Sequence, residues 1–137
     1  MHVSLESFEH ATDRLEEAIV RLRECPADEM VRDSVIKRFE FTYELSHRVL
    51  RRFLSLTEPN PEEVAEMTFP QLIRTGNQRH LLMSDWTRWH RFRDLRNKTA
   101  HPYNESMAIE VSEGAPAFLD EARFLLRAIE ARQQETR

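Results

Sequence analysis

Apolar residues recur along the first half of the chain at the three- and four-residue steps of amphipathic helices. Near the N-terminus they are Leu5, Phe8, Leu15, Ile19 and Leu22, which predicts a helix over residues of about 4 to 24. From Met30 to Leu56 a broader apolar face continues without Gly or Pro, which predicts the longest helix and the spine of the fold. CPADE, between the two stretches, is typical of a turn.

Prolines and capping residues divide the middle of the chain. In TEPNPEE, Asn60 suits the N-cap of a third helix, the proline after it suits the first helical position, and Glu63 suits the return hydrogen bond of a capping box. Pro70 should interrupt this helix, unless Thr68 caps a second short turn that leads to Gly76.

A fourth helix begins near residue 84 or 85, where the apolar positions resume. These positions are Trp86, Trp89, Phe92 and Leu95. Pro102 should end this helix at His101, because a proline ring removes a donor and clashes with the preceding turn. Asn104 can cap a last helix, which Pro116 breaks or kinks.

The composition agrees with helices throughout. The 137 residues include only 2 Gly, and 32% are charged, most of them helix-favouring Glu and Arg. Short connections between long helices favour antiparallel neighbours. We therefore predict one domain over residues 1–137 with an all-α fold, an up-and-down four-helix bundle with an additional short helix.

The sequence predicts a cytoplasmic protein. No apolar run approaches the length of a membrane span, and MHVSLESFEH lacks the layout of a signal peptide. The single Cys25 has no partner for a disulfide, as is usual in a reducing compartment. The net charge of -4 argues against a protein that coats nucleic acid, but residues 79–98 carry six cations against two carboxylates and can attract phosphate locally.

The basic segment leads into LRNKTAHPYNE, residues 95–105, which places Arg96, His101 and Tyr103 within eight residues. An Arg with a His five positions later is expected about once by chance in a chain of this composition. Requiring Asn97 beside the Arg and Tyr103 two residues after the His lowers the expectation to roughly a few in ten thousand. The extended pattern is therefore informative, although the short one is not.

Arginine and histidine together can cleave RNA without a metal or cofactor. An imidazole has an ordinary pKa of about 6.5, so it can take the proton of a 2′-hydroxyl or give one to the leaving 5′-oxygen. A guanidinium can bind two phosphate oxygens and stabilise the charge of the transition state. The roles predicted are His101 as general acid or base, Arg96 as phosphate clamp and Asn97 as an orienting polar group. Five residues on a regular helix rotate about 140°, so the end of the helix must let His101 turn back toward Arg96 or toward a second subunit.

A structural interpretation competes with the catalytic one. Arg96 can bind the carbonyl groups at the helix end, with His101 and Tyr103 as turn residues packed on the bundle. Trp86, Trp89 and Phe92 are core or dimer contacts more often than base-stacking platforms. The histidines at positions 10, 47, 80 and 90 show no spacing typical of metal ligands.

Two stretches resemble a known family. DSVIKRFEFTYELSHRVLRRFL, residues 33–54, resembles the long second helix of the nucleotidyltransferase substrate-binding proteins, a branch of the HEPN superfamily. RNKTAHPY matches the Arg-x4-His-x-Tyr signature of that superfamily without a gap. Relatives often have a Trp-Lys pair where this chain has His47 and Arg48.

The resemblance implies a helical bundle that forms a homodimer and brings Arg96 and His101 of both subunits into one cleft. It implies a ribonuclease toxin, with RNA as substrate, that a small nucleotidyltransferase antitoxin neutralises by transferring AMP to Tyr103. An alternative for the same family is a non-catalytic substrate- or nucleotide-binding subunit of a two-component nucleotidyltransferase. The chain itself has no Gly-rich phosphate loop and no Asp-x-Asp metal pair, so nucleotidyl transfer must come from the partner.

Overall fold

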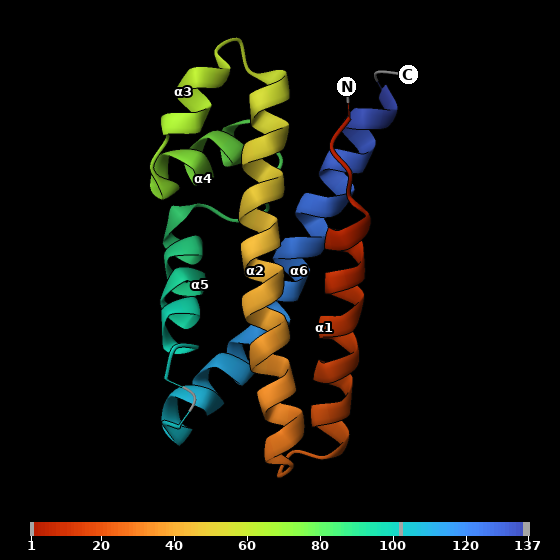
Figure 1. Cartoon of the computed structure of the whole chain (residues 1–137), viewed down its shortest axis with the longest axis vertical. Coiled ribbons are helices and arrows are strands. Elements are labelled where there is room, and N and C mark those ends of the chain that lie inside the picture. The colour runs from red at the N-terminus through yellow and green to blue at the C-terminus, as the bar shows by residue number, and fades with distance from the viewer. Residues whose placement is uncertain (1, 102, 136–137) are drawn as a thin grey trace.

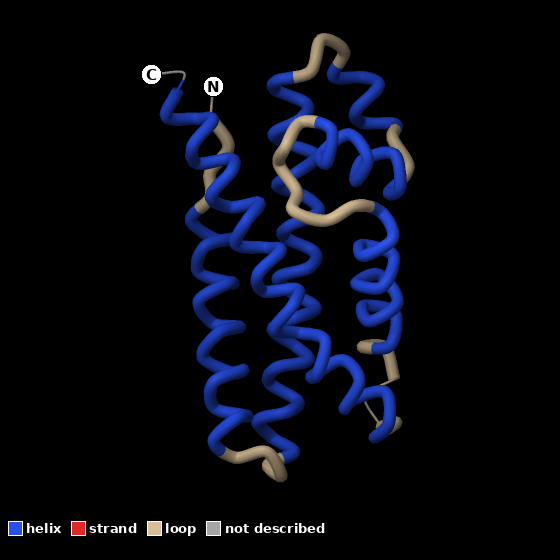
Figure 2. The backbone as a smooth tube through the Cα atoms, turned by 180° about the vertical axis from the view of Figure 1, so that it is seen from behind, coloured by secondary structure: helices blue, strands red, loops and turns tan. Residues whose placement is uncertain are grey.

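The computed structural model describes residues 2–101 and 103–135, and this part of the chain folds into six α-helices with no strand (Figures 1 and 2). Four are long: α1 (Glu6–Glu24), α2 (Glu29–Thr57), α5 (Trp86–Lys98) and α6 (Glu105–Glu135). Two are short: α3 (Pro61–Glu66) and α4 (Phe69–Gln78). The long helices run alternately up and down, which confirms the predicted bundle (Figure 1).

Both long N-terminal helices lie within two residues of their predicted bounds. Asp28 starts α2, because its side chain accepts hydrogen bonds from the backbone N–H groups of Met30 and Val31. The apolar faces of α1 and α2 pack against each other and against α6, around buried Phe8, Leu15 and Phe39. No helix in the described residues combines the length and apolar character needed to span a bilayer.

The region around Pro70 follows the second of the two predicted outcomes. Asn60 caps α3, and Thr68 and Gln71 form a complete capping box at the start of α4, with Pro70 in its first turn. The bundle therefore has two additional short helices where one was predicted. Gly76 lies inside α4, which continues to Gln78, so its predicted role at the helix end is wrong.

The last helix is long and continuous. Asn104 caps it through a hydrogen bond from the backbone N–H of Met107, as predicted. Pro116 lies inside α6 without ending it. Figure 1 shows the first part of α6 slanting from beneath α5 toward the centre of the bundle, and the later part running beside α1 to the end where both termini lie. There Gln133 bonds both backbone groups of Val3.

Candidate functional site

The predicted site lies where α5 ends, at the end of the bundle away from both termini (Figure 1). The helix ends at Lys98, three residues before the predicted end at His101. Thr99 caps it, with its backbone N–H directed to the carbonyls of Leu95 and Arg96, and the N–H of His101 bonds the carbonyl of Lys98. Pro102, to which we assigned the helix end, lies outside the described residues. His101 thus follows the helix, and the helical rotation between it and Arg96 does not apply.

Arg96 is held by two side chains. Its Nε donates to Glu44 Oε1 of α2 at 2.8 Å, and its Nη1 donates to Thr99 Oγ1 at 3.4 Å. The side chain is about one-third exposed. Within residues 2–101 and 103–135, Nη2 makes no hydrogen bond or ion pair. The guanidinium is therefore oriented from one side and keeps donors for a ligand.

Thr99 connects this arginine to a second carboxylate on α2. The buried hydroxyl of Thr99 lies 2.7 Å from Glu40 Oε2 and 2.6 Å from the carbonyl oxygen of Arg96. Burial alone would raise the pKa of Glu40, but hydrogen bonds from Thr99 and Lys37 and the nearby guanidinium of Arg96 lower it overall. Glu40 is thus ionised at neutral pH and fixes Thr99 beneath Arg96.

The other motif residues are exposed. The side chains of Asn97 and His101 face solvent and make no hydrogen bond within the described part of the chain, and Tyr103 is 100% exposed. The structural interpretation is therefore wrong for Tyr103, which does not pack on the bundle, and for Arg96, which crosses to α2 and does not bind the helix-end carbonyls. The chain places Arg96 and His101 at the same helix end without an interaction between their side chains.

The aromatic residues of α5 are chiefly core residues, as predicted. Trp89 and Phe92 are buried and pack edge-on against Phe118 of α6. Trp86, half-buried, contacts Phe69 of α4 at a centroid distance of 5.8 Å. These contacts hold α5 against α4 and α6. They therefore determine the position along α2 that Arg96 faces.

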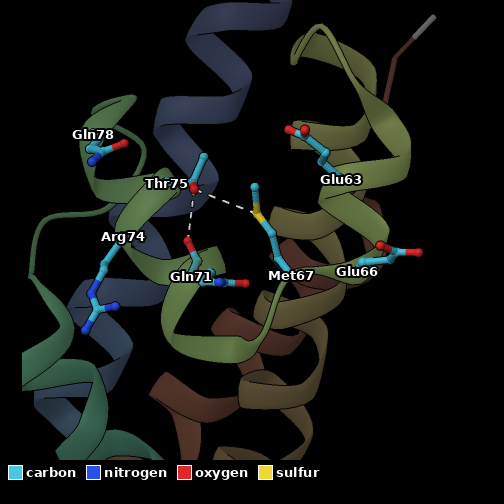
Figure 3. Close-up of a pocket in the computed structure, with 7 residues that line it drawn as sticks. All are labelled: Glu63, Glu66, Met67, Gln71, Arg74, Thr75 and Gln78. Carbon is cyan, nitrogen blue, oxygen red and sulfur yellow. Dashed lines mark hydrogen bonds between the residues drawn. The ribbon is translucent and has the colours of Figure 1, made fainter.

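A cleft of about 480 Å³ lies apart from the motif, between α3 and α4 (Figure 3). Its centre holds Met67 and Thr75, whose hydroxyl lies 3.7 Å from the Met67 sulfur. The charged side chains at its rim, Glu66 and Arg74, point away from each other in Figure 3. Without convergent polar groups this cleft does not have the arrangement of a ligand site.

Sequence reasoning missed the residues that orient Arg96. They are Glu40, Glu44 and Thr99, and a signal for them exists. The two glutamates stand four apart in FEFTYEL, on one side of a helix whose other face is apolar. Thr99 lies inside the motif itself. A half-buried arginine needs acceptors, and these residues supply them.

The fold and site define a small all-α bundle with an exposed histidine beside an anchored arginine. A family profile described as nucleotidyltransferase substrate binding protein like matches residues 3–131, and the chain belongs to this family, within the HEPN superfamily. It is 34% identical over 99 residues to a "probable ribonuclease HepT" of Haemophilus influenzae, covering 72% of this chain and 67% of that protein.

A solved structure from the same organism has this fold. It is described as the fold of a substrate binding domain of a nucleotidyltransferase. It superposes with a TM-score of 0.86 at 27% identity and covers 93% of this chain and 99% of its own. The relatives therefore carry both functional descriptions, ribonuclease and binding domain.

Proposed function

We propose that this chain is a metal-independent endoribonuclease toxin of the cytoplasm, with Arg96 and His101 as its catalytic residues. Asn97 orients the substrate or the histidine from the exposed side of α5. The probable ribonuclease among the relatives supports the class of activity. The observation that carries the proposal is the state of Arg96, which is anchored to Glu44 and Thr99 and keeps free donors. It lies at the same helix end as His101, whose side chain has no partner in the described chain.

The reaction follows from the chemistry of the two groups. An imidazole accepts the proton of the 2′-hydroxyl, the 2′-oxygen bonds to phosphorus, and the bond from phosphorus to the 5′-oxygen breaks. The leaving oxygen takes a proton, so the products are a 2′,3′-cyclic phosphate and a 5′-hydroxyl. Arg96 binds the non-bridging oxygens, where charge develops in the transition state. DNA, which lacks the 2′-hydroxyl, is not cut.

The family description implies a nucleotidyltransferase partner. In our proposal this partner is the antitoxin. The hydroxyl oxygen of Tyr103 loses its proton and bonds to the α-phosphorus of ATP, so AMP is transferred and pyrophosphate leaves. The complete exposure of Tyr103 supports this role, because the nucleotidyltransferase can reach its hydroxyl without unfolding the chain. The added phosphate would stand two residues from His101, where Arg96 can bind it in place of RNA. The active toxin is a homodimer with both motifs in one cleft.

The second candidate is a non-catalytic subunit that binds substrate for a nucleotidyltransferase. It is favoured by the description of the solved relative as a substrate binding domain. In that case the complex with the partner transfers nucleotides only when this chain is present, and RNA survives incubation with the isolated protein.

The deciding experiment is RNA cleavage by the purified chain in EDTA. We expect fragments with 2′,3′-cyclic phosphate ends from RNA and no cleavage of DNA of the same sequence. His101→Ala should cut about 10² to 10⁴ times more slowly. His90→Ala, which changes an exposed histidine on α5 outside the motif, is the matched control and should cut like the parent. Equal rates for His101→Ala and the parent would exclude His101 as the acid or base.

A second experiment tests the role of Tyr103. Tyr103→Phe keeps the ring and removes the acceptor hydroxyl. We expect this variant to arrest bacterial growth even when the nucleotidyltransferase is co-expressed, while the parent chain is neutralised and gains the mass of AMP. Neutralisation of Tyr103→Phe by the partner would show that another group is modified or that binding alone suffices.

A further inference from the structure

Arg93, an arginine without an ion pair in the described part of the chain, lies about one helical turn before Arg96. Arg93 and Arg96 are three residues apart on α5, so they project to nearly the same side. The guanidinium carbon of Arg93 lies 5.6 Å from the ring centroid of Phe69 of α4. No carboxylate in residues 2–101 and 103–135 forms an ion pair with Arg93, which is exposed. Its charge is thus supported by an aromatic face and open to an anion.

Tyr43 of α2 adds a hydroxyl on the side of α2 that packs against Phe69. Its ring is buried, with 5% exposed, against Phe39 and Phe118. Its hydroxyl has no hydrogen-bond partner in the described part of the chain, although a buried phenol normally has one. Burial raises the pKa of Tyr43, and the charges that act on the hydroxyl include both Arg93 and Arg96. The Tyr43 ring also contacts Phe69 at a centroid distance of 6.0 Å, so Tyr43 and Arg93 share this aromatic neighbour.

His47 completes the group on the side of α2. Its ring stands edge-on to Phe69 at a centroid distance of 4.8 Å. Burial, together with the nearby charge of Arg51, lowers the pKa of His47, so the ring is neutral at pH 7. Its Nε2 lies 3.4 Å from Nη2 of Arg51, which can only donate, so Nδ1 is left to donate a hydrogen bond to a ligand. Arg93 is one of the charges that act on the His47 ring.

Arg93 and Arg96 face successive parts of α2. Arg96 bonds Glu44, whereas Arg93 and His47, three residues along each helix, both contact the ring of Phe69. Three residues advance a helix by about 4.5 Å. Arg93 is therefore less than one helical turn from Arg96 along α5.

We propose that Arg93, the Tyr43 hydroxyl and His47 form a subsite for a phosphate of single-stranded RNA, next to the phosphodiester that is cut. This inference rests on the proposed ribonuclease function and deepens it. The Arg93 guanidinium and the Tyr43 hydroxyl, which have no hydrogen-bond partner in the described part of the chain, are donors, and phosphate oxygens are acceptors for both. One face of the Arg93 guanidinium covers Phe69, and the other is free to stack on a base. A protein partner would need a matching carboxylate, whereas RNA supplies a charge at every step.

The test measures binding of a short 2′-O-methyl RNA, which cannot be cut because its 2′-oxygen is blocked. Fluorescence anisotropy at several salt concentrations gives the affinity and its salt dependence. Arg93→Gln should weaken binding by roughly three- to tenfold and lower the salt slope by about one. Tyr43→Phe, which keeps the packing, should weaken binding by about threefold and leave the salt slope unchanged.

Arg91→Gln is the matched control. Arg91 is also an exposed arginine of α5, but it does not contact Phe69. It lines a cleft with Lys98 of α5 and Glu110 of α6. It should leave binding almost unchanged. Equal losses for Arg91→Gln and Arg93→Gln would overturn the subsite, because the effect would then be one of general charge. Binding of free AMP and of the nucleotidyltransferase is measured as well. If Arg93→Gln weakens the binding of either one but not the binding of RNA, the assignment of the subsite to RNA is wrong.

Cleavage of unmodified RNA separates this inference from the proposed function. If the subsite is correct, Arg93→Gln raises KM and leaves kcat near the parental value. If the parent cuts RNA but Arg93→Gln has the parental KM, the subsite fails and the ribonuclease stands. If the parent cuts no RNA in EDTA yet binds the oligonucleotide through Arg93, the ribonuclease fails and the subsite stands.

Discussion

Arg96 is oriented by groups that lie far away in the sequence. Glu44, which binds its Nε, is 52 residues away, and Glu40, which holds Thr99, is 59 residues from Thr99. An exposed arginine loses side-chain entropy when it binds phosphate, and an arginine already held in place loses less. In the proposed reaction Glu44 is therefore a positioning residue that works through Arg96.

Glu44→Ala should lower kcat for RNA about tenfold, because the guanidinium loses its anchor in α2. Glu44→Gln keeps an oxygen that can accept from Nε and should restore most of the rate, which a purely structural role would not predict. The free energy of unfolding of both variants should lie within about 1 kcal/mol of the parental value, since the ion pair is partly exposed. RNA cleavage rates and urea unfolding provide the measurements. A parental rate for Glu44→Ala would exclude positioning by this carboxylate.

His47 makes the stability depend on pH. Burial first, and then Arg51, lowers its pKa in the folded chain below the ordinary 6.5. As the pH falls through about 6.5 the unfolded chain therefore takes up a proton that the folded chain does not, and stability is lost. His47→Phe keeps a ring against Phe69 but cannot be protonated. Between pH 7.5 and 5.5 its free energy of unfolding should fall less than that of the parent, by a difference of up to about 1 kcal/mol. Urea unfolding across this range tests it, and identical pH profiles would contradict it.

At the scale of helices, the sequence predicted best the helix starts that depend on hydrogen bonds between residues close together in the chain. The caps at Asn60 and Asn104 follow from side chains that bond backbone N–H groups two or three residues away, and both were found. The end of α5 was misplaced because Thr99, which caps it, is fixed by Glu40 on another helix. Gly76 was misassigned for a similar reason, since the neighbours that require a glycine come from elsewhere in the fold.

Gly76→Ala should destabilise the fold by about 1 kcal/mol. A Cβ at Gly76 would stand 3.0 Å from Leu82 and 3.2 Å from Leu50, both buried, so it overpacks the contact of α4 with α2. This cost exceeds the gain in helix propensity of about 1 kcal/mol that alanine brings. At Gly114 of α6 a Cβ would come still closer to the methyl end of Leu95, but this side chain is only half-buried and can rotate away. Gly114→Ala should therefore stay within about 0.5 kcal/mol of the parent. Thermal unfolding distinguishes the two, and equal effects would contradict the packing argument.

The whole molecule separates the candidate site from the termini. The antiparallel course puts the end of α5 and the start of α6 at one end of the bundle and both termini at the other (Figure 1). The antiparallel course could be predicted for α1 with α2 and for α5 with α6, because their short connections favour it, whereas α2 and α5 are joined through α3 and α4. The contacts of His101 could not be predicted, because its side chain finds no partner in the described chain. In the proposed dimer, a second subunit would supply that partner.

Mixing two inactive variants decides whether Arg96 and His101 act across the dimer. Suppose that each site takes its arginine from one subunit and its histidine from the other. A heterodimer of Arg96→Ala and His101→Ala then contains one intact site of two. Random refolding makes about half of the dimers heterodimers, so up to about a quarter of the parental rate should return. If both residues of a site come from one subunit, every site in the mixture lacks one of them, and the loss of about 10² to 10⁴ in rate persists.

Light scattering first establishes that the protein is a dimer, and subunits are then exchanged by unfolding and refolding the two variants together. Each variant refolded alone is the control. A mixture as inactive as its components would contradict a shared site and place the catalytic pair within one chain.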